Sequence, residues 1–316
     1  MSETNHNKVR FITVTEASAG QRIDNFLMKE YKFLPKTAIY KLLRKGEIRI
    51  NKKRVKPVNK LEIGDEIRVA PLRDIPQSSA EEPIGQNKLT SISSAVILED
   101  DDLIILNKPS GIAVHSGTDT KHGVIEILRQ LYGKDQFLEL AHRIDKETSG
   151  ILIVAKNRKS LLGLHELFKT GDINKHYQTL VLGRWIGGER RVENYLERSE
   201  QGMQNMQVSA SGEGKRAESV FSPVQSFDNN SLISVRLLTG RMHQIRTQLA
   251  DMSLPIAGDS KYGDFSANRE FSRLTGLKRL FLHAYRVDFK LTHSNQAYNI
   301  EIPLADDLQA VIQQLQ

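Results

Sequence analysis

The sequence predicts an α+β protein of two domains, in which the larger domain has a mixed, mostly antiparallel sheet. Its length of 316 residues exceeds the usual size of a single domain. Strand-like apolar runs follow one another with helices interspersed irregularly, so the regular strand–helix alternation of a doubly wound fold is missing. Hydrophobic residues make up 39% and charged residues 26% of the chain, which is ordinary for a globular protein.

The distribution of positive charge separates the two domains. Residues 1–71 contain sixteen Lys/Arg and eight Asp/Glu, a net +8, and because the whole chain carries +7, the remainder sums to −1. We therefore expect a basic domain over 13–71 and a nearly neutral domain over 93–316. Between them, residues 72–92 mix Pro, Ser, Gln and Glu without an apolar period, which is typical of a linker.

The basic domain should contain a helix over 35–46, followed by short strands with turns at 51–53 and 64–65. Proline suits the first turn of a helix, and glycine suits its end. Three apolar residues recur at helical spacing and should face a core: Ile39, Leu42 and Leu43. A charge run alone is equally typical of a solvated surface. Bases concentrated on one side of a helix and hairpin are better matched to a phosphate backbone.

The larger domain should begin with a hairpin that ends in the Pro-Ser-Gly loop at 109–111. Helices are expected around 122–132 and 161–168, and the β-branched run over 151–156 suits a buried strand. Further strand-like runs lie at 176–182, 216–224, 232–238 and 284–291. This strand-rich order is the reason for the α+β assignment.

The absence of cysteine excludes many kinds of chemistry. A chain without Cys has no disulfides, no Cys-ligated zinc, no iron–sulfur cluster and no thiolate nucleophile. The sequence also lacks the motifs of dinucleotide-binding enzymes, P-loop ATPases, zinc proteases and α/β-hydrolases, which argues against these classes of enzyme. No apolar run reaches the roughly 18 to 20 residues of a membrane span, and the first residues do not resemble a secretory signal. We therefore expect a cytoplasmic protein without a membrane partner.

Three polar clusters in apolar surroundings remain as candidates for chemistry. They are AHRIDKETSG with Asp145, NKHYQTLVLG with Tyr177, and TGRMHQIR with Arg246. Taken singly, each has an ordinary explanation. Asp145 could cap a helix or turn, Tyr177 could be a half-buried strand residue, and Arg246 could be a surface cation.

Taken together, these segments strongly resemble a known family. The succession NKPSG, HRIDKETSGILIVAKN, KHYQTLV, GRMHQIR, LPIAGDSKYG and LFLHA resembles the RluA-type RNA pseudouridine synthases over residues 93–305. The segments QRIDNFL, PKTAIYKLLRKGEIRINKKRVKP and LEIGDEIRV resemble the S4 (alpha-L) RNA-binding domain over residues 20–70. The S4 resemblance implies an RNA-facing surface formed by Arg22, Lys36, Tyr40, Arg44, Lys45, Arg49 and Lys53.

The family resemblance implies isomerisation of uridine to pseudouridine in 23S ribosomal RNA, by base flipping and without a cofactor or metal. It implies that Asp145 is the essential carboxylate and that Arg246 pairs with it. Tyr177 would stack on the flipped base, and Arg143 would enter the space that the base leaves. Either role of the carboxylate, as a nucleophile or as a base at C2′, requires its ionised form, which a nearby cation stabilises.

Two positions depart from the family pattern, because Met242 replaces the usual Thr and Gln248 replaces the usual His. We expect His243 and Gln244 to brace the segment that carries Arg246, and Leu282 and His283 to form pocket wall. Three alternatives remain open: another S4-containing rRNA synthase of D-type specificity, a non-catalytic RNA-binding or ribosome-assembly protein, and a glycoside hydrolase with an unspecified second carboxylate. We expect the protein to be a monomer.

Overall fold

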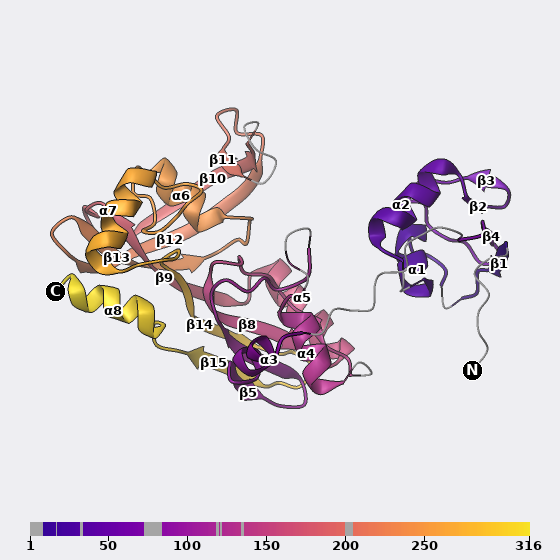
Figure 1. The fold of residues 1–316 in the computed structure, drawn as a ribbon, viewed down its shortest axis with the longest axis horizontal. Helices are drawn as coiled ribbons and strands as arrows, with labels where there is room; N and C mark the ends of the chain where they lie inside the picture. Colours follow the sequence, from indigo (N-terminus) through magenta and orange to yellow (C-terminus); the bar gives the residue numbers. More distant parts are fainter. Residues whose placement is uncertain are drawn as a thin grey trace. The chain divides into compact units, whose positions relative to one another are not determined.

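The computed structural model describes residues 9–316 except 17, 32–33, 73–83, 118–119, 121, 134–135 and 200–204. The chain forms two compact units, Met1–Pro83 and Ile84–Gln316 (Figure 1). In the described part of the chain, no helix is long and apolar enough to cross a membrane.

The first unit combines two helices with a four-stranded antiparallel sheet of order β1-β4-β2-β3. Its elements are β1 (Arg10–Thr13), α1 (Ile23–Glu30), α2 (Lys36–Lys45), β2 (Ile48–Ile50), β3 (Lys53–Arg54) and β4 (Glu66–Val69). The predicted helix is confirmed, since α2 begins after Pro35 and ends at Gly46, which has a left-handed φ of 73°. Its three predicted apolar residues are buried in the core of this unit.

The second unit is built on one 11-stranded sheet. Neighbouring strands follow the order β11-β10-β12-β13-β9-β14-β8-β6-β5, with β15 beside β14 and β7 beside β8. β14 and β8 pair in parallel, and every other neighbouring pair in this sheet is antiparallel. The predicted mixed, mostly antiparallel sheet is therefore confirmed.

The strands of this unit are β5 (Val96–Glu99), β6 (Leu103–Lys108), β7 (Glu139–Leu140), β8 (Ser149–Ala155), β9 (Asn174–Leu182), β10 (Arg190–Arg198), β11 (Met206–Val208), β12 (Lys215–Ser226), β13 (Asn230–Leu237), β14 (Leu282–Lys290) and β15 (Ala297–Glu301). Its helices are α3 (Gln86–Ser93), α4 (Val124–Tyr132), α5 (Arg158–Thr170), α6 (Gln244–Asp251), α7 (Phe265–Thr275) and α8 (Asp306–Gln314).

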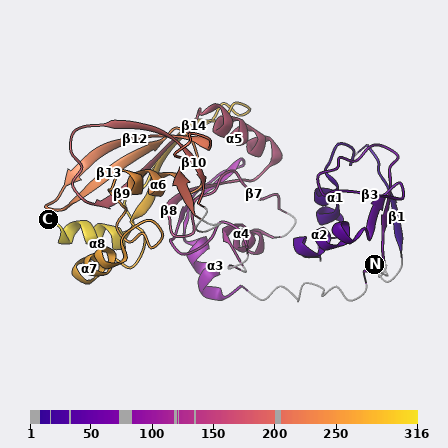
Figure 2. The same ribbon diagram turned by 90° about the horizontal axis from the view of Figure 1, so that it is seen from above.

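Strands β6 and β8 are covered on both faces. Ile151 and Ile153 of β8 pack in one cluster with Leu164 of α5, whereas the alternate residues Leu152 and Val154 pack in another with α3 and α4. Figure 2 shows α5 on the opposite side of β8 from α3 and α4. The buried strand predicted over 151–156 is thus confirmed, and its β-branched residues fill two cores.

The segment predicted as a linker differs from the structure in its second half. Residues 73–83 lie outside the described residues, but the second unit begins at Ile84, and α3 follows it directly. Ile84 and Ile92 are buried in the cluster that includes α4. Only three apolar side chains, Ile84, Leu89 and Ile92, lie among the polar residues of this segment, which is too few for composition alone to reveal that the segment packs.

Candidate active site

Asp145 lies in the loop between β7 and β8, and its side chain is 28% exposed. Its Oδ2 lies 3.5 Å from Nη1 of Arg246 and 3.8 Å from Nε2 of His243. The structure therefore brings together residues about a hundred positions apart, as the resemblance implies for Asp145 and Arg246. A partly exposed carboxylate beside a cation is available both to solvent and to a ligand.

Arg246 is held by a second carboxylate that sequence reasoning missed. Nε and Nη2 of Arg246 donate to Oδ2 and Oδ1 of Asp259 at 2.8 and 2.7 Å, and both side chains are almost fully buried. Oδ1 also accepts from the backbone N–H groups of Lys261 and Tyr262. Burial alone would raise the pKa of Asp259, but the hydrogen bonds and charge of Arg246 lower it. The bidentate pair fixes the guanidinium plane and leaves Nη1 directed at Asp145.

Tyr262 and His243 complete the surroundings of Arg246. The ring of Tyr262 lies 5.0 Å from the guanidinium carbon, within the range of a cation–π contact. The Tyr262 hydroxyl is 2.7 Å from Nδ1 of His243, whose pKa is lowered, chiefly by burial. His243 precedes α6 with a left-handed φ of 54°. These contacts support the expectation that His243 braces the arginine.

Tyr177 lies on β9 and is 7% exposed. Burial, together with the nearby charge of Asp145, raises the pKa of Tyr177, so its phenol stays protonated at neutral pH. The structure thus places Tyr177 close enough to Asp145 for the two to interact electrostatically. A neutral aromatic ring beside the carboxylate is compatible with base stacking, which stays a prediction.

Arg143 is exposed, two residues before Asp145. No hydrogen bond or ion pair joins it to another described residue. Burial and the charge of Arg143 both lower the pKa of His115, which indicates that the two side chains are near each other. Without a carboxylate partner among the described residues, this exposed cation is available to an anionic ligand.

The NKPSG segment, residues 107–111, holds the loop of Asp145 in place through hydrogen bonds to the backbone of that loop. Lys108 is fully buried, and its Nζ donates to the carbonyls of Pro109, Ile112 and Lys146 at 2.9, 2.8 and 3.1 Å. The Ser110 hydroxyl donates to the carbonyl of Glu147, the next residue of the same loop, at 2.6 Å. Burial lowers the pKa of Lys108 to about 7. Three carbonyl acceptors stabilise the buried amine and fix the residue that follows Asp145.

A second buried chain of hydrogen bonds fixes the start of β8. Arg279 donates to the Ser149 hydroxyl at 3.0 Å, the hydroxyl lies 2.8 Å from Nδ1 of His283, and Nε2 of His283 lies 3.0 Å from the Pro303 carbonyl. His283 is fully buried, and burial lowers its pKa to about 4. Gly150 follows with a φ of 108°, and a methyl group there would lie 2.2 Å from a backbone oxygen of β14. Only glycine therefore permits this parallel strand pairing.

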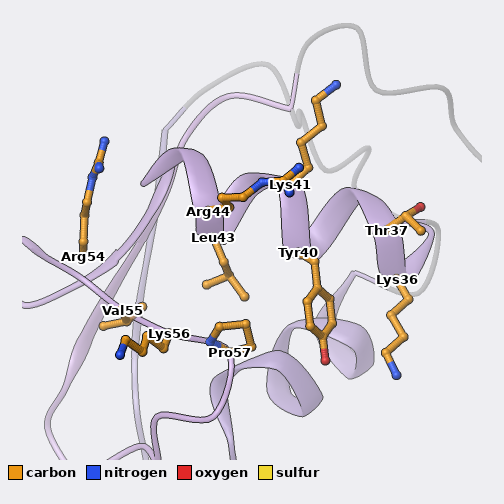
Figure 3. A pocket seen from close by; sticks show the side chains of 10 residues that line it. All are labelled: Lys36, Thr37, Tyr40, Lys41, Leu43, Arg44, Arg54, Val55, Lys56 and Pro57. Atoms are coloured by element: carbon orange, nitrogen blue, oxygen red, sulfur yellow. The ribbon is translucent and has the colours of Figure 1, made fainter. Parts of the chain in front are cut away.

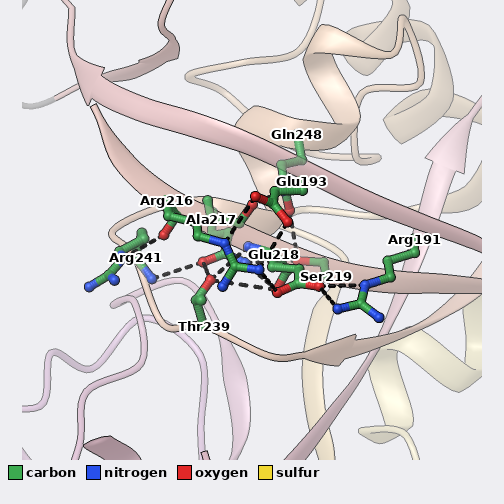
Figure 4. A network of polar contacts seen from close by, with 10 residues as sticks. Arg191, Glu193, Arg216, Ala217, Glu218, Ser219, Thr239, Arg241 and Gln248 are labelled. Atoms are coloured by element: carbon green, nitrogen blue, oxygen red, sulfur yellow. Dashed lines mark hydrogen bonds and ion pairs between the residues drawn. The ribbon is translucent and has the colours of Figure 1, made fainter. Parts of the chain in front are cut away.

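Gln244 and Gln248 attach α6 to β12. Gln244 accepts from the backbone of Arg241 at 3.0 Å and donates to the carbonyl of Glu218 at 3.0 Å. Gln248, which departs from the family pattern, is fully buried and accepts from the hydroxyl of Ser219 at 2.7 Å. Gln248 therefore helps to hold α6 against β12. Figure 4 shows this region with its ion pairs.

The first unit carries a basic groove of about 1090 Å³ (Figure 3). Three of the predicted RNA-facing residues line it: Lys36, Tyr40 and Arg44. Three further cations that were not assigned individually also line it: Lys41, Arg54 and Lys56. The apolar floor is formed by Leu43, Val55 and Pro57. The run of nine bases over 35–56 already contained these cations, but the sequence could not show which of them share one surface.

The other four predicted RNA-facing residues do not line this groove. Arg22 binds Asp24 through Nε and Nη2 at 3.1 and 2.6 Å, and the Tyr40 hydroxyl binds the same carboxylate at 2.8 Å. Nε of Arg49 donates to a backbone carbonyl at 3.1 Å. Lys45 lies 3.7 Å from Glu47, and Lys53 is exposed on β3. Local acceptors thus compete with RNA for several of these side chains.

A mixed sheet with an arginine-paired aspartate in one of its loops, in a chain that also has a small basic domain, is the arrangement that the sequence resemblance implies for an RNA pseudouridine synthase. The family model for RNA pseudouridylate synthase matches residues 102–251, and the S4 domain model matches residues 21–67. The chain belongs to the RNA pseudouridylate synthase family. It is 40% identical to ribosomal large subunit pseudouridine synthase C of Haemophilus influenzae over 98% of this chain and 96% of the relative. The protein of the same name from Escherichia coli K12 is 40% identical over 99% and 98% of the two chains.

Solved structures show the same fold. Human RNA pseudouridylate synthase domain containing 4 matches with a TM-score of 0.61 and 21% identity, over 72% of this chain and 95% of that one. Human RNA pseudouridylate synthase domain containing 1 matches with a TM-score of 0.58 and 22% identity, over 69% and 86%.

The Asp259→Asn substitution tests the role of the second carboxylate. It keeps the shape of the side chain but removes the charge that fixes Arg246, so we expect kcat to fall about 100-fold. Loss of the buried pair should also lower the free energy of unfolding by about 3 kcal/mol. Turnover of uridine-containing rRNA and chemical denaturation measure the two effects. Asp264→Asn is the control, because Asp264 caps α7 in the same segment and Asn is also a good cap. Unchanged turnover in Asp259→Asn would contradict this role.

Buried His283 makes stability depend on pH. The unfolded chain protonates this imidazole near pH 6.5, whereas the folded chain, with a pKa of about 4, does not. The unfolded state then binds more protons, so stability falls as pH drops from 6.5 toward 4. His283 alone should contribute a loss of about 2 kcal/mol by pH 5. Urea titrations followed by fluorescence of Trp185, the single tryptophan, report on this unit. His283→Gln should be less stable at pH 7 and should show a correspondingly shallower loss; an equal slope in both proteins would refute the assignment.

Proposed function

We propose that this chain isomerises specific uridines of large-subunit ribosomal RNA to pseudouridine, with Asp145 as the catalytic residue. The observation that carries the proposal is the carboxylate of Asp145, 3.5 Å from Nη1 of an arginine whose other nitrogens are held by Asp259. Two curated relatives, 40% identical to this chain, are named as large-subunit synthases of C type. Their names favour large-subunit rRNA of C-type specificity over the D-type alternative.

The reaction breaks the N1–C1′ bond of uridine and forms a C5–C1′ bond. The proton on C5 leaves to solvent, and N1 gains a proton, so atoms balance without redox change or group transfer. Asp145 acts next to the sugar in its ionised form, either by adding to the substrate or by removing the C2′ proton. Arg246 stabilises that ionised form and orients it. We propose no cofactor and no metal for this chemistry.

The target base must leave its stack before it can reach Asp145. Unstacking costs a few kcal/mol, which stacking on an aromatic ring and phosphate contacts offset. The Tyr177 ring is the proposed stacking surface, since its phenol is neutral and near the carboxylate. Arg143, exposed and without a carboxylate partner among the described residues, is proposed to occupy the space that the base leaves.

The S4 domain is proposed to bind the rRNA backbone through the groove of Figure 3. Its cations come from α2, from β3 and from the segment after β3, and its floor is apolar. Backbone phosphates can bind to the cations, while an unpaired base can pack against the apolar floor. We propose that the protein acts as a monomer in the cytoplasm, where rRNA is available.

Asp145→Asn tests the catalytic assignment. Because Asn cannot act as a nucleophile or a base, we expect pseudouridine formation to fall at least about 10³-fold, with rRNA binding nearly unchanged. Release of tritium from rRNA labelled at C5 of uridine measures turnover. Asp101→Asn is the matched control, since Asp101 is an exposed carboxylate in the turn between β5 and β6. Near-normal turnover in Asp145→Asn would rule out the assignment. Wild-type protein that binds rRNA without forming pseudouridine would favour the non-catalytic alternative.

The groove is tested with the double variant Lys41→Gln, Arg44→Gln. Log affinity falls with log salt, and each lost phosphate contact makes this slope less steep by roughly 0.7 to 0.9. The loss of two contacts should therefore reduce the steepness by about 1.5. The control is Lys29→Gln, Lys60→Gln, which removes two exposed cations that do not line the groove. Filter binding of a large-subunit rRNA transcript over a salt series provides the measurement. Identical slopes for both double variants would show that RNA does not occupy this groove.

A further inference from the structure

Lys175 is a recessed cation that the proposed mechanism does not use. It lies on β9 two residues before Tyr177, so both side chains project from the same face of the sheet. Its Nζ lies 5.5 Å from the ring centre of Phe168 and has no hydrogen bond or ion pair with any described residue. Burial lowers its pKa to about 8. A largely desolvated amine without an anion nearby is unfavourable unless a ligand supplies one.

Arg241 directly follows a residue that lies close to Lys175, and it too has no acidic partner in the described chain. Residue 240, directly before it, is a glycine, and a methyl carbon there would lie 3.8 Å from Nζ of Lys175. Nε of Arg241 donates to the carbonyl of Arg216 at 2.9 Å, which fixes the side chain. Its terminal nitrogens have no hydrogen bond to described residues. Figure 4 shows its guanidinium directed away from the carboxylates of Glu193 and Glu218.

The neighbouring residues Arg191 and Arg216 differ from Arg241, because acidic side chains already neutralise them. Arg216 pairs with Glu193 at 2.9 Å and with Glu218 at 2.5 Å, and Arg191 pairs with Glu218 as well. The Glu218 side chain is only 4% exposed, so these pairs leave it unavailable to other cations. The acids of this region are therefore engaged, and Lys175 and Arg241 keep their full attraction for an anion.

The two cations lie on two segments that lead to the proposed reaction centre. The turn that starts at Gly240 continues to His243, whose Nε2 lies 3.8 Å from Asp145. Lys175 and Tyr177 approach the same region from β9, and Lys175 is directly paired with Leu237 at the end of β13. An anion held between Lys175 and Arg241 would thus be close to the proposed position of the flipped base, but not at the reacting atoms.

We propose that Lys175 and Arg241 together bind one backbone phosphate of the RNA next to the target uridine. The inference rests on the proposed function, because the phosphate belongs to the same substrate. The ammonium supplies a point charge and the guanidinium a planar donor pair, a combination suited to phosphate oxygens. A backbone contact of this kind carries no sequence information but fixes the register of the strand. Lys175 and Arg241 are therefore positioning residues that set which nucleotide can reach Tyr177.

The test measures RNA binding by Lys175→Met, Arg241→Gln and the double variant, each in the Asp145→Asn background so that no turnover occurs. The probe is a large-subunit rRNA transcript. We expect each single variant to weaken binding about tenfold and to flatten the salt slope by roughly 0.7 to 0.9. Because both side chains hold one phosphate, the double variant should be weakened by less than the product of the two single effects.

Conservative and remote substitutions separate a phosphate contact from a packing role. Lys175→Arg keeps the charge and should retain affinity within about threefold, whereas a role in packing against Phe168 alone predicts that Met binds as well as Lys. Lys159→Met removes an exposed cation at the other end of α5 and should leave affinity and salt slope unchanged. In proteins with Asp145, Lys175→Met should raise KM more than it lowers kcat.

The outcomes distinguish this inference from the function on which it rests. If the wild-type protein forms pseudouridine while Lys175→Met and Arg241→Gln bind the transcript normally, the phosphate site is overturned and the proposed function stands. Strictly multiplicative single effects would also overturn a shared phosphate. If the wild-type protein neither binds nor modifies the rRNA, both proposals fail together.

Discussion

The buried ion pair between Arg246 and Asp259 is the constraint on which the rest of the site depends. Two hydrogen bonds of 2.7 and 2.8 Å fix the guanidinium in one plane, and two backbone N–H groups fix the carboxylate in turn. One nitrogen of the arginine then remains for Asp145. Such a pair is not an efficient source of stability, because desolvation of both charges opposes their attraction. Its role here is orientation. Because Asp259 holds the guanidinium rigidly, Arg246 can stabilise the charge of the partly exposed Asp145 carboxylate without forming a tight ion pair with it.

The sheet brings these groups together from distant parts of the chain. Asp145 precedes β8, which pairs in parallel with β14, while Tyr177 lies on β9 on the other side of β14. Gly150 permits the close approach of β8 to β14, and Lys108 joins its own loop to the loop of Asp145 by binding the carbonyls of Pro109, Ile112 and Lys146. The segments NKPSG and TSG therefore serve the geometry of Asp145 without reacting. Many residues of the motifs that carry the family resemblance hold the backbone in place. For this reason they are not among the catalytic candidates.

Much of this architecture could be predicted from sequence because it depends on local physics. The α2 helix follows from its proline, its glycine and the spacing of Ile39, Leu42 and Leu43, and the buried β8 strand follows from its β-branched run. Asp259 could not be predicted, since a lone acid in a loop shows nothing about a partner in α6 until the chain is folded. The RNA contact of Arg22 stays a prediction, and the structure adds that its guanidinium already binds Asp24, two residues away. In each case, the missing information was which charges already neutralise one another.

The same reasoning applies to the charge of the second unit. Residues 72–316 sum to −1, which suggests little attraction for a polyanion. The net charge conceals an uneven distribution, however, because Arg191 and Arg216 are paired with acids while Arg143, Lys175 and Arg241 are not paired with any in the described chain. The unpaired cations lie near the segments that carry Asp145, Tyr177 and His243. Since a local field depends on uncompensated charges and falls off within about 8–10 Å at physiological salt, this unit can be neutral overall and still attract an anionic strand at the proposed reaction centre.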